Sequence, residues 1–188
     1  MNLHNKIVSF DDEKLIVVDE DDNILRYQTK ADCHKGKGIL HRAFSVFLFN
    51  DQKELLLQKR SQEKRLWPFY WSNSCCSHPR KGENTDEAAH RRVKEELGLT
   101  TQLHFLYKFQ YQAFYRNLGS ENEVCSVYIG KSEGQIVVNK NEIADWKFIN
   151  IEDIYADIEA NPALYTPWFK MECDRIGKDF MTQINELF

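Results

Sequence analysis

The stretch from residue 73 to residue 99 concentrates the side chains whose types and spacing could do chemistry. Cys76 and His78 lie two positions apart, so an extended backbone places both side chains on one face. Further along, Glu95 and Glu96 lie in the last turn of a predicted helix, where the helix dipole disfavours negative charge. Two acids in that place are typical of a site for a divalent cation with phosphate nearby. An ordinary solvated helix face is the alternative.

The helix that carries these acids has recognisable ends. Asn84 is the predicted N-cap, with Glu87 as the N3 partner of a capping box, and Gly98 is predicted to end the helix. Arg91 and Arg92 each precede a glutamate by four residues, so they can form ion pairs that offset the repulsion between the two acids. The sequence therefore predicts a helix between residues 84 and 98 with paired charges near its C-terminus.

The spacing of charges in residues 77–99 resembles the Nudix box, G-x5-E-x7-R-E-U-x-E-E-x-G-U, in which U is a bulky aliphatic residue. Glu83 and Arg91 occupy the positions of its first glutamate and its arginine. Ser77 stands in place of the opening glycine, and Arg92 stands in place of the glutamate that follows the arginine. The resemblance implies binding of a diphosphate with Mg²⁺, whereas the two departures argue against ordinary diphosphate hydrolysis.

A second group of acids lies in the stretch ENEVC. Glu121 and Glu123 are two positions apart in a predicted strand, so both carboxylates can face one cation. With His34, His41 and His78 they make three imidazoles and two carboxylates, a set that suits a divalent first-row metal such as Mn²⁺ or Zn²⁺. Exposed glutamates at the start of a strand, and histidines used only for packing, are the alternative.

Composition limits the class of protein. The chain has 188 residues, a hydrophobic fraction of 42% and a net charge of −4, which favours one globular domain over residues 1–188 and gives no reason to expect nucleic acid or membrane partners. The first residues contain no long apolar run, so neither a signal peptide nor a membrane span is expected. Five cysteines, two of them adjacent, argue against a disulfide framework and favour a reducing compartment. A cytoplasmic protein is therefore expected.

Hydrophobic patterns and turn residues predict the elements that must position these side chains. An N-terminal hairpin is expected over residues 14–28, followed by a loop at residues 30–41. The C-terminal end is predicted as one helix that has Thr166 as N-cap, begins at Pro167 and runs to about Leu187. The other patterns predict strands at residues 43–50, 54–60, 104–115, 121–131 and 146–150 and a helix at 152–159. The sum is an α/β (α+β) fold, a Nudix-like mixed β-sheet core flanked by helices.

The chain resembles the type I isopentenyl-diphosphate isomerases, which are enzymes of the Nudix fold. The matching stretches are KADCHKGKGILHRAFSVFLFN, QKRSQEKRLWPFYWSNSCCSHPRKGE, RRVKEELG, FQYQAFY, ENEVC and TPWF, in order from Lys30 to Phe169. The patterns NS-x-C-x-HP and ENEVC are more discriminating than the Nudix box by itself. The resemblance implies the isomerisation of isopentenyl diphosphate to dimethylallyl diphosphate in isoprenoid biosynthesis, with a small-molecule diphosphate as the partner.

The resemblance also implies roles for individual residues. Cys76 and Glu123 would be the two acid/base groups on opposite faces of the substrate, with Tyr111 beside the carboxylate. The three histidines and two glutamates named above would hold Mn²⁺ or Zn²⁺, and Glu96 would help to hold Mg²⁺ on the diphosphate. Trp168 would lie over the hydrocarbon end of the substrate. The basic residues that would bind the diphosphate are Lys30, Arg60, Lys64 and Arg92.

Three other functions remain open on the sequence. A Nudix diphosphate hydrolase would need a metal-bound water at the box, and the adjacent arginines argue against one. Cys75 and Cys76 could form a redox or metal-sensing element, although adjacent cysteines are strained as disulfide partners. A non-catalytic binding module would retain Arg60 and Glu96 but lose Cys76 or Glu123, and both are present. A monomer or a weak homodimer is expected.

Overall fold

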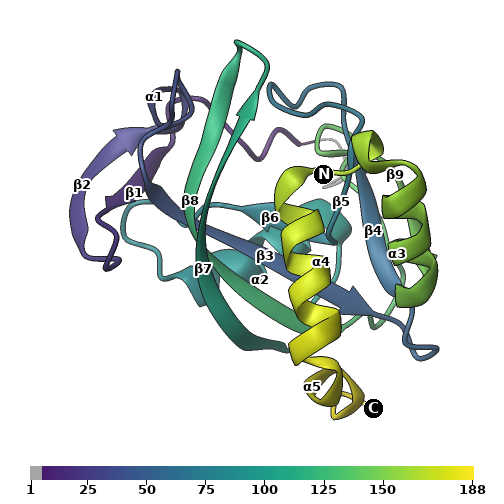
Figure 1. Cartoon of the computed structure of the whole chain (residues 1–188). Coiled ribbons are helices and arrows are strands. Elements are labelled where there is room, and N and C mark those ends of the chain that lie inside the picture. The colour runs from purple at the N-terminus through teal and green to yellow at the C-terminus, as the bar shows by residue number, and fades with distance from the viewer. Residues whose placement is uncertain (1–5) are drawn as a thin grey trace.

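One mixed sheet of nine strands runs through the chain, as seen in a computed structural model that describes residues 6–188 (Figure 1). The strands are β1 (Lys14–Val18), β2 (Ile24–Thr29), β3 (His41–Phe49), β4 (Leu55–Arg60), β5 (Trp71–Ser72), β6 (Cys75–Ser77), β7 (Leu103–Tyr115), β8 (Gly119–Lys131) and β9 (Ile143–Ile149). The helices are α1 (Lys30–Cys33), α2 (Thr85–Leu97), α3 (Ile151–Ala160), the 3₁₀ turn η2 (Pro162–Leu164), α4 (Pro167–Asp179) and α5 (Met181–Asn185). The predicted α/β fold with a mixed sheet is confirmed.

Strand β3 brings distant parts of the sequence together. Its residues HRAFSVFLF are nearly all buried, as expected for a strand covered on both faces. It runs parallel to β8 with His41 opposite Glu123, and antiparallel to β6 with Ser45 opposite Cys76. Residues 44–46 pair with both neighbours at once, so β6 and β8 lie on opposite edges of β3.

The sheet separates two hydrophobic cores. On one face Phe47 and Phe49 pack with side chains of α3 and α4, and on the other Val46 and Leu48 pack with those of α2. Figure 1 shows α4 in front of the sheet and α2 behind it. Because successive strand residues point to opposite faces, an unbroken apolar run can fill both cores, at roughly 1.5–3 kcal/mol for each large side chain buried. None of the helices between residues 6 and 188 is long and apolar enough to span a lipid bilayer.

Helix α2 has the ends that the sequence predicts. The Asn84 side chain accepts a hydrogen bond from the Glu87 N–H at 2.8 Å, a contact typically worth about 1 kcal/mol. Gly98 ends the helix with a φ of 73°, in the left-handed region that glycine adopts most readily. The predicted ion pairs are also present, because Arg91 and Arg92 each reach the glutamate four residues later.

Two predicted elements differ from the structure. The prediction of a single C-terminal helix was wrong at Phe180. This residue leaves the helical conformation with a φ of −127° and divides the segment into α4 and α5. The Phe180 ring stacks on Tyr107 at a centroid distance of 5.0 Å, so tertiary packing interrupts the local helical pattern. In the predicted loop at residues 30–41, the first turn is helix α1, since the Thr29 side chain accepts a hydrogen bond from the Asp32 N–H and caps it.

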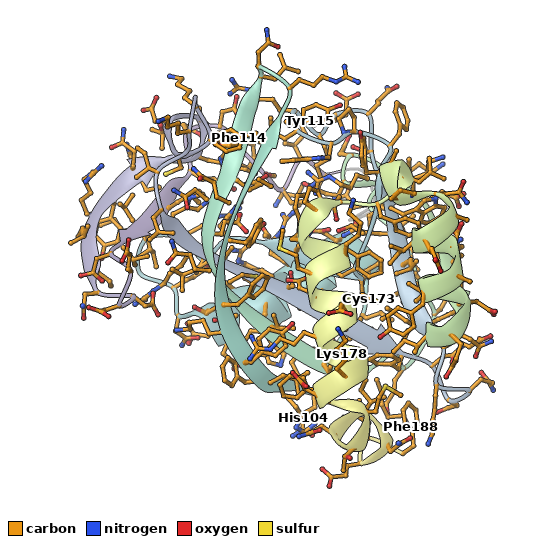
Figure 2. The ribbon with its side chains drawn as sticks, viewed as in Figure 1. His104, Phe114, Tyr115, Cys173, Lys178 and Phe188 are labelled. Atoms are coloured by element: carbon orange, nitrogen blue, oxygen red, sulfur yellow. The ribbon has the colours of Figure 1, made fainter. Side chains whose placement is uncertain are left out.

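The β7–β8 hairpin forms a long arm beside the other strands (Figure 1). Figure 2 shows Phe114 and Tyr115 on opposite sides of this arm, as the alternation of a strand requires. Phe114 is exposed, whereas Tyr115 packs on Trp67 with ring centroids 5.0 Å apart. The register of the hairpin places Tyr111 directly opposite Glu123, so two predicted site residues become cross-strand neighbours.

Candidate active site

A cavity of about 330 Å³ collects side chains from both ends of the sequence. Apolar lining comes from residues such as Phe44 and Leu66. Most of the predicted site residues also line it, namely Lys30, His34, Arg60, Lys64, Cys76, His78, Tyr111, Glu121, Glu123 and Trp168. The predicted residues His41, Arg92 and Glu96 lie outside this lining and contact it through neighbours described below. The cavity therefore combines anion-binding, metal-binding and proton-transfer groups.

The three histidines and two glutamates of the predicted metal site meet in one buried cluster. They are His34, His41, His78, Glu121 and Glu123, and their ligand atoms all lie within 4.8 Å of one another. The centroids of the imidazole rings are 4.9–5.1 Å apart. The sheet produces this meeting, because the cluster is drawn from the end of α1, the start of β3, the residue after β6 and the start of β8.

The donor set of this cluster fits a divalent metal ion. His34 donates from Nδ1 to the Lys30 carbonyl and His41 from Nδ1 to the Ile39 carbonyl, each at 2.7 Å. A carbonyl only accepts, so Nε2 is the atom of each ring turned toward the cluster. His41 Nε2 is buried and has no hydrogen-bond partner within residues 6–188, and His34 Nε2 lies 2.7 Å from Glu121 Oε2. A cation would satisfy the His41 nitrogen and the facing Glu121 oxygen, since buried polar groups rarely remain unpaired.

The two glutamates of the cluster differ in charge. Burial, together with the neighbouring Glu121, raises the pKa of the Glu123 carboxyl well above its usual range. Burial acts in the same direction on Glu121, but the His34 imidazole at 2.7 Å outweighs it and holds the pKa of Glu121 at about 2. Tyr111 donates to Glu123 at 2.6 Å, and His78 Nε2 lies 2.8 Å from the other Glu123 oxygen. Glu123 is therefore the carboxyl of the pair that can hold a proton.

The adjacent cysteines have different surroundings because side chains alternate along β6. Cys76 lines the cavity, whereas Cys75 is fully buried in the core beneath α2. Burial raises the pKa of the Cys76 thiol to about 11, and the nearby Arg60 guanidinium opposes this effect. Arg60 Nη1 lies 3.8 Å from the Cys76 sulfur. The Cys76 thiol therefore keeps its proton at neutral pH.

Three basic side chains give the cavity a positive end. Burial and the nearby Lys64 lower the pKa of Lys30 to about 8, because each ammonium group disfavours the charge of the other. Arg60 donates from Nε to the Trp67 carbonyl at 3.0 Å and from Nη2 to the Leu66 carbonyl at 2.9 Å. These contacts fix the guanidinium plane. Cations that are partly or fully buried around one cavity favour the binding of an anion.

Arg92 and Glu96 lie behind the basic end of the cavity. Arg92 donates to Glu96 at 2.6 Å and lies 3.3 Å from Glu142, and all three side chains are buried. Glu142 lines the cavity and also pairs with Lys64, so it links Arg92 to the cavity. The second Glu96 oxygen is buried with no hydrogen-bond partner in the described chain, which fits a hard cation such as Mg²⁺. Sequence analysis missed Glu142, because a single glutamate before a strand carries no local signal.

Trp168 lines the cavity beside Arg60, and its neighbours fix the ring. Its Nε1 donates to the Ser72 hydroxyl at 3.1 Å, and Trp67 meets it edge to face at a centroid distance of 5.2 Å. The Arg60 guanidinium lies 5.2 Å from its ring centroid. The orientation of the indole is therefore fixed before any ligand binds.

Two acids at the Nudix positions, Glu83 and Glu95, form ion pairs with Arg91 outside the cavity. Arg91 donates to both oxygens of Glu83, at 2.5 and 2.9 Å, and to Glu95 at 3.0 Å. Neither Glu83 nor Glu95 lines the cavity. These ion pairs stabilise the contact between α2 and the turn before it. The thiol and the carboxyl of the cavity come instead from strands β6 and β8.

The fold and this cavity define a Nudix-domain protein in which a thiol and a carboxyl share a site with a metal-type cluster. Residues 39–169 match the family model described as the NUDIX domain. A crystal structure of DR0079 from Deinococcus radiodurans superimposes with a TM-score of 0.71, covering 87% of this chain and 98% of that one at 24% identity, which shows the shared fold. The chain of the MutT protein from Methanosarcina mazei gives a TM-score of 0.59 at 20% identity, covering 74% of this chain and 96% of its own.

Curated relatives narrow the class further. The chain is 44% identical to isopentenyl-diphosphate Delta-isomerase 1 of Photorhabdus laumondii, over 85% of this chain and 92% of that protein. It is 37% identical to isopentenyl-diphosphate delta-isomerase IDI1 of Gibberella zeae, over 87% of this chain and 73% of that protein. The chain belongs to the isopentenyl-diphosphate Delta-isomerase family, and the resemblance drawn from its sequence is confirmed.

Proposed function

We propose that this protein interconverts isopentenyl diphosphate and dimethylallyl diphosphate for isoprenoid biosynthesis, with Cys76 and Glu123 as its two proton-transfer groups. One observation carries the proposal. The two side chains come from strands on opposite edges of β3, and both line the same cavity. Two acid/base groups that flank β3 and line one cavity fit the reaction, because it adds one proton and removes another on opposite faces of the substrate.

The bond changes define what the two groups must do. A C–H bond forms at the terminal alkene carbon, a C–H bond at C2 breaks, and the electron pair released at C2 forms the new double bond. One group loses a proton and the other gains one, so the pair must be reset between turnovers. An isolated alkene is a very weak base, so its protonation is favoured where water does not compete for the proton. Phe44 and Leu66 supply apolar lining of this kind.

The carboxyl of this pair is held in place by neighbours. Tyr111 donates to one Glu123 oxygen and His78 lies beside the other, so the carboxyl has little freedom to turn. We assign Mn²⁺ or Zn²⁺ to the buried histidine and glutamate cluster. When bound, such an ion supplies positive charge that lowers the proton affinity of its ligands. In this arrangement Tyr111 holds the Glu123 carboxyl and also lines the cavity.

The diphosphate would bind at the positive end of the cavity. We assign this role to Lys30, Arg60, Lys64 and Arg92, and we assign Glu96 to Mg²⁺ carried by the diphosphate. Arg60 supports the proposal most directly, because it reaches from the basic end of the cavity to within 3.8 Å of the Cys76 sulfur. Fixing the diphosphate there would hold the short hydrocarbon chain beside both proton-transfer groups, which is a gain in positioning.

Trp168 would lie against the hydrocarbon end of the substrate. Protonation of the alkene creates tertiary carbocation character, and an indole face stabilises such charge by about 2 kcal/mol when it is shielded from water. The fixed orientation of Trp168 supports this role, since a ring that is already in place loses no freedom during the reaction. We further propose a cytoplasmic monomer or weak homodimer, in keeping with five cysteines that are all free thiols.

The test is proton NMR of the purified protein with isopentenyl diphosphate, Mg²⁺ and Mn²⁺ in D₂O. Dimethylallyl diphosphate that carries deuterium is the expected product. The Cys76→Ala variant should lose this product while still binding inorganic diphosphate. Cys75→Ala is the matched control and should remain active, because Cys75 lies in the core and does not reach the cavity. Release of phosphate without isomerisation would overturn the proposal, and equal loss in both cysteine variants would overturn the assignment of Cys76.

A further inference from the structure

The start of β8 lies beyond the start of β3. The parallel ladder between the two strands begins with His41 opposite Glu123, so residues 119–122 of β8 have no partner in β3. The loop of residues 34–40, which connects α1 to β3, lies along this free edge. The Ser120 N–H donates to the His34 carbonyl at 3.1 Å, a bond of the kind that a neighbouring strand would make.

Side chains of β8 hold the same loop at two further points. The Ser120 hydroxyl donates to the Gly36 carbonyl at 3.0 Å, and the Asn122 amide donates to the Gly38 carbonyl at 3.3 Å. Ser120 and Asn122 alternate with Glu121 and Glu123 along the strand, so their side chains point away from the cluster. One short stretch of β8 thus supplies two glutamates to the metal-type cluster. It also supplies two side chains that hydrogen-bond to the loop between His34 and His41, and we call these contacts the clamp.

The loop and β8 approach each other closely at two glycines. A Cβ atom on Gly119 would lie 2.4 Å from the His34 carbonyl oxygen, and the φ of Gly119 is +156°. A Cβ atom on Gly38 would lie 2.7 Å from the Ser120 hydroxyl, and its φ is +74°. Gly36, in the same loop, has a φ of +57° but open space where its Cβ would be. The contact at Gly119 is therefore one between two backbones, with no room for a methyl group, whereas the contact at Gly38 is with the Ser120 and Asn122 side chains.

We propose that Gly119, Ser120 and Asn122 are positioning residues that set the metal affinity of the histidine and glutamate cluster by seating the loop between His34 and His41. The proposal rests on the metal site assigned under the proposed function. These contacts fix the backbone positions of both histidines. The Nδ1 atom of each histidine is hydrogen-bonded to a carbonyl of the neighbouring backbone, so a shift of the loop changes the position of one Nε2 atom relative to the other. Loss of a hydrogen bond made directly to a metal ligand typically weakens metal binding about 10–100-fold, and this range sets the scale for the contacts that hold the loop.

The experiment measures Mn²⁺ affinity directly, by electron paramagnetic resonance of free Mn²⁺ during titration of the metal-free protein. Gly119→Ala should weaken binding by about 10–100-fold, and Ser120→Ala, which removes only the hydroxyl bond to Gly36, by about tenfold. Gly134→Ala is the control, because it places alanine at a positive φ without a clash and lies outside both the loop and β8. The Mn²⁺ affinity of this control should stay within about threefold of the parent protein, because the hydrogen bonds between β8 and the loop remain intact.

Further measurements separate positioning from loss of folding and from failure of the metal site. Thermal unfolding of the metal-free variants reports on the fold, and Ser120→Ala should melt close to the parent protein. Saturating Mn²⁺ should restore turnover in Ser120→Ala without changing KM for the diphosphate substrate. Unchanged Mn²⁺ affinity in both Gly119→Ala and Ser120→Ala would overturn the clamp while leaving the metal site in place. Absence of Mn²⁺ and Zn²⁺ binding to the parent protein would overturn both proposals.

Discussion

The protonation state of the buried Glu172 carboxyl can be tested through the pH dependence of folding stability. Its side chain is fully buried on α4, one turn beyond Trp168, and one oxygen has no hydrogen-bond partner in the described part of the chain. The other oxygen lies 3.7 Å from the Cys125 sulfur. Burial raises the pKa of the Glu172 carboxyl to about 8, against the opposing contacts of Ser45 and Cys125. We therefore expect a neutral acid at this position at pH 7.

The raised pKa makes folding stability depend on pH in a known direction. The unfolded chain releases the Glu172 proton near the ordinary value of 4.5, whereas the folded chain keeps it until about pH 8. Between these values the unfolded state gains charge first, so the stabilisation present in acid is lost as the pH rises. Each pKa unit corresponds to about 1.4 kcal/mol, so the free energy of unfolding should fall by about 2–3 kcal/mol from about pH 5.5 to about pH 7.5 through this residue alone.

Glu172→Gln removes that dependence, because the amide is neutral throughout and has nearly the same shape. Urea unfolding followed by tryptophan fluorescence, with a reductant to keep the thiols free, measures both proteins at the two pH values. The stability advantage of the variant over the parent should grow by about 2–3 kcal/mol at the higher pH. Glu159→Gln, at an exposed position on α3, should show no such growth. A constant difference between variant and parent would refute a protonated Glu172.

Three further changes have expected outcomes of different kinds. Glu123→Gln should lower kcat by about 10²–10⁴-fold and weaken Mn²⁺ binding, and a variant with normal turnover would remove Glu123 from the reaction. Glu142→Gln removes the carboxylate that pairs with half-buried Lys64 and with buried Arg92, so it should destabilise the fold by about 3 kcal/mol in denaturant titrations. Inorganic diphosphate should restore part of that stability, and no loss of stability would contradict the bridging role. Gly177→Ala places a Cβ 1.6 Å from the Tyr155 hydroxyl, so the Tyr155 ring must move and give up its hydrogen bond to the Cys173 carbonyl. The melting temperature should fall by an amount equivalent to about 1–3 kcal/mol.

The sequence predicted features that depend on neighbouring residues. The caps at Asn84 and Gly98 and the ion pairs within α2 appear as expected, because each involves groups only a few positions apart. The alternation of strand side chains likewise separates Cys75 from Cys76 without any tertiary information. The prediction failed at Phe180, since the local helical pattern carries no record of the Tyr107 ring on which Phe180 stacks.

By itself, then, the sequence determined the chemical inventory of this protein: its histidines, acids, thiols and basic residues, and the strands and helices that carry them. The tertiary structure alone decided which of these groups meet. The metal-type cluster exists because β3 and β8 pair in the register that sets His41 opposite Glu123, and the bridge from Arg92 through Glu142 to Lys64 crosses three separate segments. Local hydrogen bonds and hydrophobic periodicity act over a few residues, whereas such meetings are fixed by the packing of both faces of the sheet, to which the whole chain contributes.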